Sequence, residues 1–242
     1  LATGVETKMN TCIGDGDGEI SFKMLKENYD AVYISIGAHT DKKLGIPGED
    51  AKGVISAIQM LRDIGDGNPP DFTGKNVIVV GGGNVAMDAA RTALRLGAEV
   101  HVVYRRSEAE LPARAEEVHH AKEEGVIFKL LTNPTAIIGN DKHWVEAIEC
   151  VEMELGEPDA SGRRRPQVKK DSKFVMDMDT VIIAIGQSPN PLIKNSTENL
   201  DTHKWGGIIV EEETMATSKE MVYAGGDVVS GAATVILAMG AG

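Results

Sequence analysis

Cysteine is scarce in this chain, and its scarcity excludes several kinds of site. The 242 residues include two cysteines, Cys12 and Cys150, which lie far apart in the sequence and belong to no CxxC pair. Structural zinc sites, iron–sulfur clusters and redox-active dithiols are built from closely spaced cysteines. The sequence therefore supports none of these three sites, and we expect the chain to bind no metal.

Long apolar runs and an excess of positive charge are also missing. No apolar stretch reaches the roughly 20 residues that a membrane-spanning helix needs, and no secretory signal peptide is visible. The formal net charge of −12 would repel a phosphate polymer, so we expect no nucleic-acid partner. These patterns favour a cytoplasmic protein without membrane contact.

Hydrophobic residues make up 42% of the chain, and predicted strands alternate with predicted helices. This alternation is typical of an α/β fold, as one large domain or two modest ones. A glycine- and proline-rich break at residues 65–70 predicts a domain boundary. The chain begins at Leu1 rather than methionine and stops inside an apolar helical pattern, so we expect it to be part of a longer polypeptide.

The segment 76–106 carries the most informative pattern. An apolar run at 77–80 predicts a buried strand, and it leads into glycines at 81–83 and a helical pattern at 86–96. Gly97 follows the helical pattern, where a C-cap glycine is expected. A second apolar run, 100–104, predicts another buried strand. A strand, a glycine turn, a helix and a second strand form the βαβ unit that binds dinucleotides.

The residue types in the turn suit a diphosphate. Gly81 can adopt the tight backbone geometry at the strand end, and Gly83 has no Cβ to keep phosphates away from the backbone. Ala86 is small enough for the helix to pack close to the sheet. The N–H groups at the helix start and the positive end of its dipole would then face the anion.

The end of the second strand distinguishes between coenzymes. An NAD site usually has a carboxylate there for the ribose hydroxyl, whereas the 2′-phosphate of NADP calls for arginine. Arg105 and Arg106 occupy this position, and the first carboxylate is Glu108. Guanidinium groups bind phosphate through paired hydrogen bonds and keep their charge at cellular pH. The pattern favours NADPH over NADH, with two solvated loop arginines as the alternative.

Other segments give local expectations. Residues 5–9 read as a short strand, Ser21 as the cap of a helix over residues 22–28, and residues 31–37 as a buried strand. The loop 14–18 resembles a calcium-binding loop but lacks acidic side chains at its first and last ligand positions, so we expect a polar turn. Residues 135–175 read as a small antiparallel excursion. Its basic tip, Arg163, Arg164 and Arg165 with Lys169 and Lys170, reads as a solvated hairpin loop, with a docking role as the alternative.

Four segments together resemble the FAD- and pyridine-nucleotide-dependent oxidoreductases that have two nucleotide-binding domains. They are most similar to the small (beta) subunit of glutamate synthase. The matching pieces are GGGNVAMDAARTALRLGA at 81–98, VYRRSEAELPA at 103–113, AIGQSPN at 184–190 and YAGGDVVSGAATVILAMGAG at 223–242.

The resemblance implies a Rossmann-like NADPH-binding domain, residues 72–187, inserted into a partial FAD-binding domain formed by residues 1–71 and 188–242. It implies hydride transfer from NADPH to FAD, with electrons passing on to the glutamate synthase large subunit or another iron–sulfur partner. No catalytic acid, base or nucleophile is implied. Val85 stands where a threonine is common in the family, which costs one hydroxyl contact.

The expected cofactor-binding residues come from the glycine turn, the ends of strands and the segment before the last helix. They are Gly81, Gly82, Gly83, Asn84, Val85, Ala86, Tyr104, Arg105, Arg106, Ala184, Ile185, Gly186, Gly226 and Asp227. The resemblance places Asp227 at the flavin. The first glycine turn of the family, which holds the ADP half of FAD, has no counterpart in this sequence, so we expect the chain to bind NADPH and to retain FAD poorly or not at all.

Two other functions remain open. The chain could instead be the flavoprotein module of a related enzyme, such as a ferredoxin:NADP oxidoreductase or dihydropyrimidine dehydrogenase. It could also be a nucleotide-binding fragment with no turnover of its own.

Overall fold

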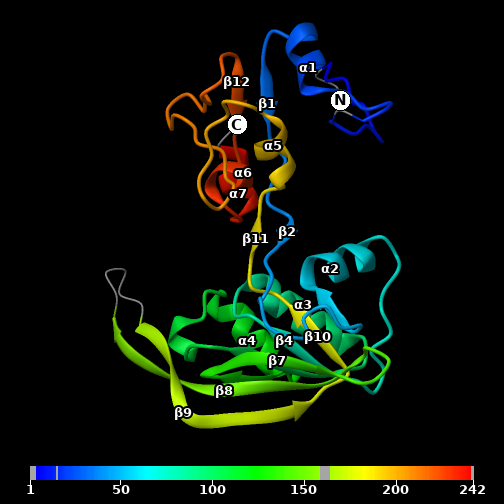
Figure 1. The fold of residues 1–242 in the computed structure, drawn as a ribbon, viewed down its shortest axis with the longest axis vertical. Coiled ribbons are helices and arrows are strands. Elements are labelled where there is room, and N and C mark those ends of the chain that lie inside the picture. The colour runs from blue at the N-terminus through cyan, green and yellow to red at the C-terminus, as the bar shows by residue number, and fades with distance from the viewer. Residues whose placement is uncertain (1–3, 15, 159–163, 241–242) are drawn as a thin grey trace. The chain divides into compact units, whose positions relative to one another are not determined.

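A computed structural model describes residues 4–14, 16–158 and 164–240. The chain forms two compact units (Figure 1). Leu1–Thr40 and Gln187–Gly242 make up one, which we call the discontinuous unit, and Asp41–Gly186 make up the other, the inserted unit. The short strands β2 (Thr40–Asp41) and β11 (Gln187–Ser188) pair where the chain passes from one unit to the other. The α/β class expected from the sequence is confirmed.

A five-stranded parallel sheet forms the centre of the inserted unit. Its strands, in spatial order, are β3 (Val54–Ser56), β10 (Thr180–Ile183), β4 (Asn76–Val80), β5 (Glu99–Tyr104) and β6 (Ile127–Leu130). The apolar runs predicted at 77–80 and 100–104 lie in β4 and β5, where Val77, Ile78 and Val100 are fully buried. Both faces of the sheet are covered, which explains why these strands are apolar throughout.

Three helices cover one face: α2 (Ala57–Gly65), α3 (Asn84–Arg95) and α4 (Ala115–Glu124). The alanines of α3 that face the sheet, Ala86 and Ala90 among them, have no exposed surface. Their small side chains let the helix approach the strands closely, as predicted for Ala86. Gly97, just past the end of α3, has a φ of +96°, so the predicted C-terminal glycine is confirmed.

Ion pairs join α3 to α4 at the surface. Arg91 lies 2.7 Å from Glu117 and 2.8 Å from Glu124, and Arg95 lies 2.6 Å from the same oxygen of Glu124. Hydrogen bonds from Arg95 and then Arg91 lower the pKa of the Glu124 carboxyl.

An antiparallel meander covers the opposite face of the sheet: β7 (Thr132–Gly139), β8 (Val145–Pro158) and β9 (Arg164–Asp177). Ile148 and Cys150 of β8 are fully buried and pack with Ile78 and Val103 of the central sheet. Burial raises the pKa of the Cys150 thiol to about 12. The predicted antiparallel excursion is confirmed, and Figure 1 shows β8 and β9 as one long ribbon.

The sequence predicts a loop for the basic residues of this excursion, but the described ones lie in a strand. Arg164, Arg165, Lys169 and Lys170 belong to β9 and are exposed on the ribbon, while Arg163 lies outside the described residues. A ribbon that extends beyond the sheet has two solvated faces, so its strand residues can be charged without a period of two.

The discontinuous unit is built around two parallel strands, β1 (Val32–Ile34) and β12 (Val222–Ala224). Its helices are α1 (Phe22–Asn28), α5 (Pro191–Ser196), α6 (Asp227–Ser230) and α7 (Val235–Gly240). Ser21 caps α1, as predicted, because its Oγ accepts a hydrogen bond of 3.1 Å from the N–H of Met24. The core of the discontinuous unit includes Ile34, Ile208 and Val222.

Two expected strands differ in this unit. Residues 5–9 are exposed and form no strand, since nothing pairs with them among the described residues, and residue 9 lies in a turn. The strand expected at 31–37 is reduced to β1, where Tyr33 is 45% exposed rather than buried. The polar loop 14–18 closes on Glu19, which accepts from the N–H of Gly16 at 2.8 Å, while Asp15 lies outside the described residues.

The sequence predicts the first domain boundary at residues 71 and 72, but the inserted unit begins at Asp41. Strand β3 pairs with β10, and α2 packs beside α3, so both elements belong to the inserted unit. Ser56 ends β3 and also caps α2, accepting a hydrogen bond from the N–H of Gln59 at 3.1 Å. In the ranges that the structure describes, no helix has the length and apolar character to cross a bilayer.

Candidate functional site

Gly81 begins the turn between β4 and α3, and no other residue could replace it without a shift. Its φ is +147°, and a Cβ built on it would lie 2.2 Å from the carbonyl oxygen of Ala184, at the end of β10. Its N–H donates to the carbonyl of Val103 at 3.0 Å. The turn is therefore fixed between two neighbouring strands, and it brings Ala184 next to Gly81.

The start of α3 is open to a ligand. Gly83 is the N-cap residue, and a Cβ built on it would meet nothing within 4 Å. Its carbonyl accepts from the N–H groups of Ala86 and Met87, at 3.0 and 3.2 Å. The N–H groups of Asn84 and Val85 donate to no acceptor in the described part of the chain. A helix of 12 residues with free N–H groups and an open approach is suited to an anion.

The second glycine of the turn packs against the loop that follows β5. A Cβ on Gly82 would lie 2.7 Å from the ring of Tyr104 and 2.8 Å from Leu111. Tyr104 is 9% exposed, and its hydroxyl donates to the carbonyl of Glu110 at 2.8 Å. Asn84 also connects the start of α3 to this loop, because its Oδ1 accepts a hydrogen bond from the N–H of Arg114 at 2.9 Å. The expected residues Gly82, Asn84 and Tyr104 thus shape the site through protein contacts.

The two arginines after β5 differ in their contacts. Arg105 is exposed, and its guanidinium has no hydrogen bond or ion pair within the described ranges. Arg106 is half-buried, and its Nε donates to the carbonyl oxygen of Arg164 at 3.1 Å. Both retain terminal amino groups that a phosphate could accept from.

A carboxylate that sequence reasoning missed lies at the centre of this loop. Glu110, in the 3₁₀ helix η1 (Glu108–Glu110), accepts from the N–H and hydroxyl of Ser107 and from Nε of Arg164, the last at 2.7 Å. Its side chain is 10% exposed. The Ser107 hydroxyl, followed by Arg164, lowers the pKa of the Glu110 carboxyl. The Ser107–Glu110 spacing of a capping box could have been recognised, but the contact with Arg164, 54 residues away, could not.

The remaining expected residues are divided between the two units. Ala184 donates its N–H to Val80 at 2.9 Å, Ile185 packs in the core below the meander, and Gly186 accepts from the N–H of Lys42 at 3.2 Å. Gly226 and Asp227 lie in the discontinuous unit. Asp227 begins α6, and its Oδ1 accepts from the N–H of Ala233 at 3.3 Å.

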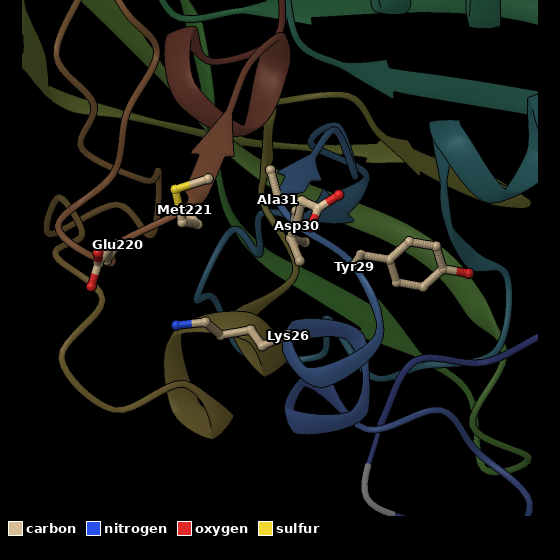
Figure 2. A pocket seen from close by; sticks show the side chains of 7 residues that line it. Lys26, Tyr29, Asp30, Ala31, Glu220 and Met221 are labelled. Carbon is tan, nitrogen blue, oxygen red and sulfur yellow. The ribbon is translucent and has the colours of Figure 1, made fainter.

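A pocket of about 130 Å³ in the discontinuous unit does not include any of the expected residues. Figure 2 shows Lys26, Asp30 and Glu220 around it, with Met221 and Tyr29. It lies at the amino ends of β1 and β12, whereas open α/β sheets hold ligands at the carboxyl ends of their strands. In the part of the chain that the structure describes, no group of three or more His, Cys, Asp or Glu side chains could hold a metal ion.

Comparison with known proteins gives a family match over nearly the whole chain. The family described as pyridine nucleotide-disulphide oxidoreductase matches residues 3–242. The chain is 45% identical to the NADP(+)-dependent formate dehydrogenase subunit beta of Moorella thermoacetica, over 100% of this chain and 34% of that protein. It is 40% identical to the NADPH-Fe(3+) oxidoreductase subunit beta of Geobacter sulfurreducens, over 98% and 38%. With the glutamate synthase (NADPH) small chain of Escherichia coli it shares 35%, over 99% and 53%.

Solved structures share the fold. FprA of Mycobacterium tuberculosis in complex with NADPH gives a TM-score of 0.69 at 22% identity, covering 90% of this chain and 62% of that one. Thioredoxin reductase of T. acidophilum gives 0.66 at 23% identity, covering 87% and 61%. The chain spans between 34% and 53% of the length of the three curated relatives named above.

Proposed function

The chain belongs to the pyridine nucleotide-disulphide oxidoreductase family, and on that premise we propose that its inserted unit binds NADPH and delivers hydride to a flavin. The observation that carries the proposal is the glycine turn. Gly81 is fixed against Ala184, while the space over Gly83 is open. The backbone can therefore approach a diphosphate at the start of α3, where free N–H groups and the helix dipole stabilise negative charge.

Arg105 and Arg106 select the phosphorylated coenzyme in this proposal. They follow β5 directly, at the position from which Rossmann-like units contact the adenosine ribose. In the described residues the Arg105 guanidinium has no hydrogen-bond partner, and the Arg106 guanidinium donates a hydrogen bond only from its Nε. Each can donate terminal N–H groups to a 2′-phosphate, which NADH lacks.

The family binds FAD as well as a pyridine nucleotide. Gly226 and Asp227, at the carboxyl end of β12, are the residues of this chain that would hold the flavin. In the discontinuous unit, β12 leads through Gly226 into α6 (Asp227–Ser230), a helix of 4 residues, which offers a diphosphate a much weaker helix dipole than the 12 residues of α3 do. We therefore propose that this chain retains FAD weakly.

The chemistry divides between cofactor and protein. Hydride acceptance is what a bound flavin supplies, and the protein binds and orients NADPH so that hydride can leave its nicotinamide. Proton transfer is not needed for that step, and we assign no catalytic acid, base or nucleophile.

The partner distinguishes two finer functions. One is the small-subunit role in NADPH-dependent glutamate synthase, with electrons passing to the large subunit. The other is the same role in a different NADPH-linked enzyme, which is favoured by the 45% identity to a formate dehydrogenase beta subunit against 35% to a glutamate synthase small chain. Reconstitution of the full-length polypeptide with a glutamate synthase large subunit, assayed by NADPH-dependent glutamate formation, distinguishes them.

Calorimetry with NADPH and NADH tests the proposed cofactor site. The double variant Arg105→Gln/Arg106→Gln is expected to bind NADPH at least 10-fold more weakly, since each charge-assisted hydrogen bond contributes about 1.5–3 kcal/mol. Binding of NADH should change by less than about twofold, because NADH lacks the phosphate. The variant Arg165→Gln is the matched control, since this arginine is exposed on β9. If the folded wild-type chain gives no binding heat with NADPH, the proposal is wrong.

A further inference from the structure

Arg164 contacts the loop that follows β5, and with Arg105 and Arg106 of that loop it makes a group of three arginines. Arg105 and Arg106 come from the strand end, and Arg164 comes from the start of β9 in the meander. The Nε of Arg106 lies 3.1 Å from the carbonyl oxygen of Arg164, so the two residues are in direct contact. Nothing in the sequence suggested that Arg164, in a basic run on a ribbon, belongs to this cluster.

Glu110 fixes the third arginine. Its carboxylate accepts from Nε of Arg164 at 2.7 Å, and Ser107 holds the same carboxylate from the other side. The described contacts of Arg164 use Nε and the backbone carbonyl, so its terminal amino groups remain available. A guanidinium can donate in this way to a carboxylate and to a phosphate at once, because it carries five N–H donors.

The charges of the cluster match those of a phosphate monoester. Three guanidinium groups and one ionised carboxylate sum to two positive charges. A phosphate monoester carries roughly −1.5 to −2 at neutral pH. Without Glu110 the guanidinium of Arg164 would lose its carboxylate partner, and without Arg164 the carboxylate of Glu110 would lose its guanidinium partner.

We propose that Arg164 is a third arginine of the pocket for the adenosine 2′-phosphate, and that Glu110 is its positioning residue. The proposal rests on the proposed NADPH site and adds a determinant of NADPH preference from outside the βαβ unit. The antiparallel meander then does more than cover the sheet, because its β8–β9 ribbon carries a ligand contact to the coenzyme.

The alternative is that Arg164 and Glu110 only attach the ribbon to the loop. A purely structural attachment would alter stability, but it would not distinguish between ligands with and without a 2′-phosphate. Adenosine 2′,5′-bisphosphate and adenosine 5′-monophosphate differ in that group alone, so they are the probes. Arg165 offers the matched control, since it is the neighbouring residue of β9, is also exposed and loses the same charge on substitution.

Calorimetry on the full chain with Arg164→Gln and Arg165→Gln, each with both probes, tests the proposal. Arg164→Gln is expected to weaken binding of adenosine 2′,5′-bisphosphate about tenfold, the size of one lost charge-assisted hydrogen bond. It should change binding of adenosine 5′-monophosphate by less than about twofold, and Arg165→Gln should leave both probes within that range.

The outcomes separate this inference from the proposed function. Equal affinity of Arg164→Gln and Arg165→Gln for the bisphosphate would overturn the role of Arg164 alone. A wild-type chain that binds the two probes equally well would overturn the NADPH site itself. If Arg164→Gln does not fold, Arg164→Lys replaces it, because lysine keeps the ion pair with Glu110 and loses the guanidinium fork. That variant is expected to bind the bisphosphate a few-fold more weakly, and wild-type affinity would overturn the proposal.

Discussion

Gly81→Ala is expected to reduce stability and Gly83→Ala to reduce NADPH binding, although the two glycines lie in one turn. At Gly81 the added Cβ would lie 2.2 Å from the carbonyl oxygen of Ala184, and the φ of +147° is one that L-residues rarely adopt. Overpacking costs about 1–3 kcal/mol, and the left-handed conformation adds about 1–2 kcal/mol. The Gly81→Ala variant should therefore lose about 2–5 kcal/mol of the free energy of unfolding, a large share of the 5–15 kcal/mol that is typical of a domain.

At Gly83 the same methyl group has room in the protein. Nothing lies within 4 Å of the built Cβ, and the φ of −88° is ordinary. Alanine is a poorer N-cap than glycine, but it also restricts the unfolded chain by about 0.4–1 kcal/mol, so the net change in stability should stay within about 1 kcal/mol. The methyl group would occupy the approach of the diphosphate to the N–H groups of α3, and NADPH binding should weaken by about 10- to 100-fold.

Urea denaturation followed by circular dichroism measures the first effect, and calorimetry with NADPH measures the second. The two variants should rank in opposite order in the two assays: Gly81→Ala is the less stable variant, and Gly83→Ala is the folded variant that binds NADPH poorly. Two variants with equal losses of stability, or a Gly83→Ala variant with wild-type affinity, would show that the turn does not divide these roles.

Three further results are expected from single groups. The lowered pKa of the Glu124 carboxyl stabilises the folded chain at pH values above 4.5, its ordinary pKa, and this stabilisation is lost as the pH falls through the pKa of the folded state. Glu124→Gln should therefore lower the urea midpoint at pH 7, and the difference in midpoint between the variant and the wild type should be smaller at pH 3. One thiol, Cys12, should react with an aromatic disulfide reagent at pH 8 in the native chain, and a second only in denaturant, because Cys150 is buried with a pKa of about 12; two fast thiols would contradict this burial. Ser56→Ala should cost about 1 kcal/mol in urea denaturation through loss of the α2 cap, and no change would mean that the cap is redundant.

Local chemistry explains which features the sequence could predict. Gly81, Gly97 and the Ser21 cap were predictable because each answers a requirement of its immediate neighbours: a positive φ or a free N–H. The central strands were predictable because burial on both faces leaves a continuous apolar run. Strand β3 was missed because its three residues precede a helical pattern that dominates the window.

The contacts between distant segments could not be predicted. The basic residues of β9 read as a loop, since a ribbon with two solvated faces carries no strand period. The contact of Arg164 with Glu110 depends on the register of β8 with β9, which places the start of β9 beside a loop that lies 54 residues earlier. The positions of Arg105 and Arg106 could be predicted by counting from the strand. It could not be predicted that Arg106 donates a hydrogen bond to the backbone of Arg164.

The hydrogen bond between Lys42 and Gly186 has a consequence for how this polypeptide could be rearranged. These residues lie next to the two ends of the segment 41–186, and the N–H of Lys42 lies 3.2 Å from the carbonyl of Gly186. A segment whose two ends are joined by a backbone hydrogen bond can interrupt a host loop with little entropic penalty, because it holds the host ends together as a short turn would. We therefore expect that the segment 41–186 can be inserted into a surface turn of an unrelated protein. It should fold there, and the host protein should keep its own fold.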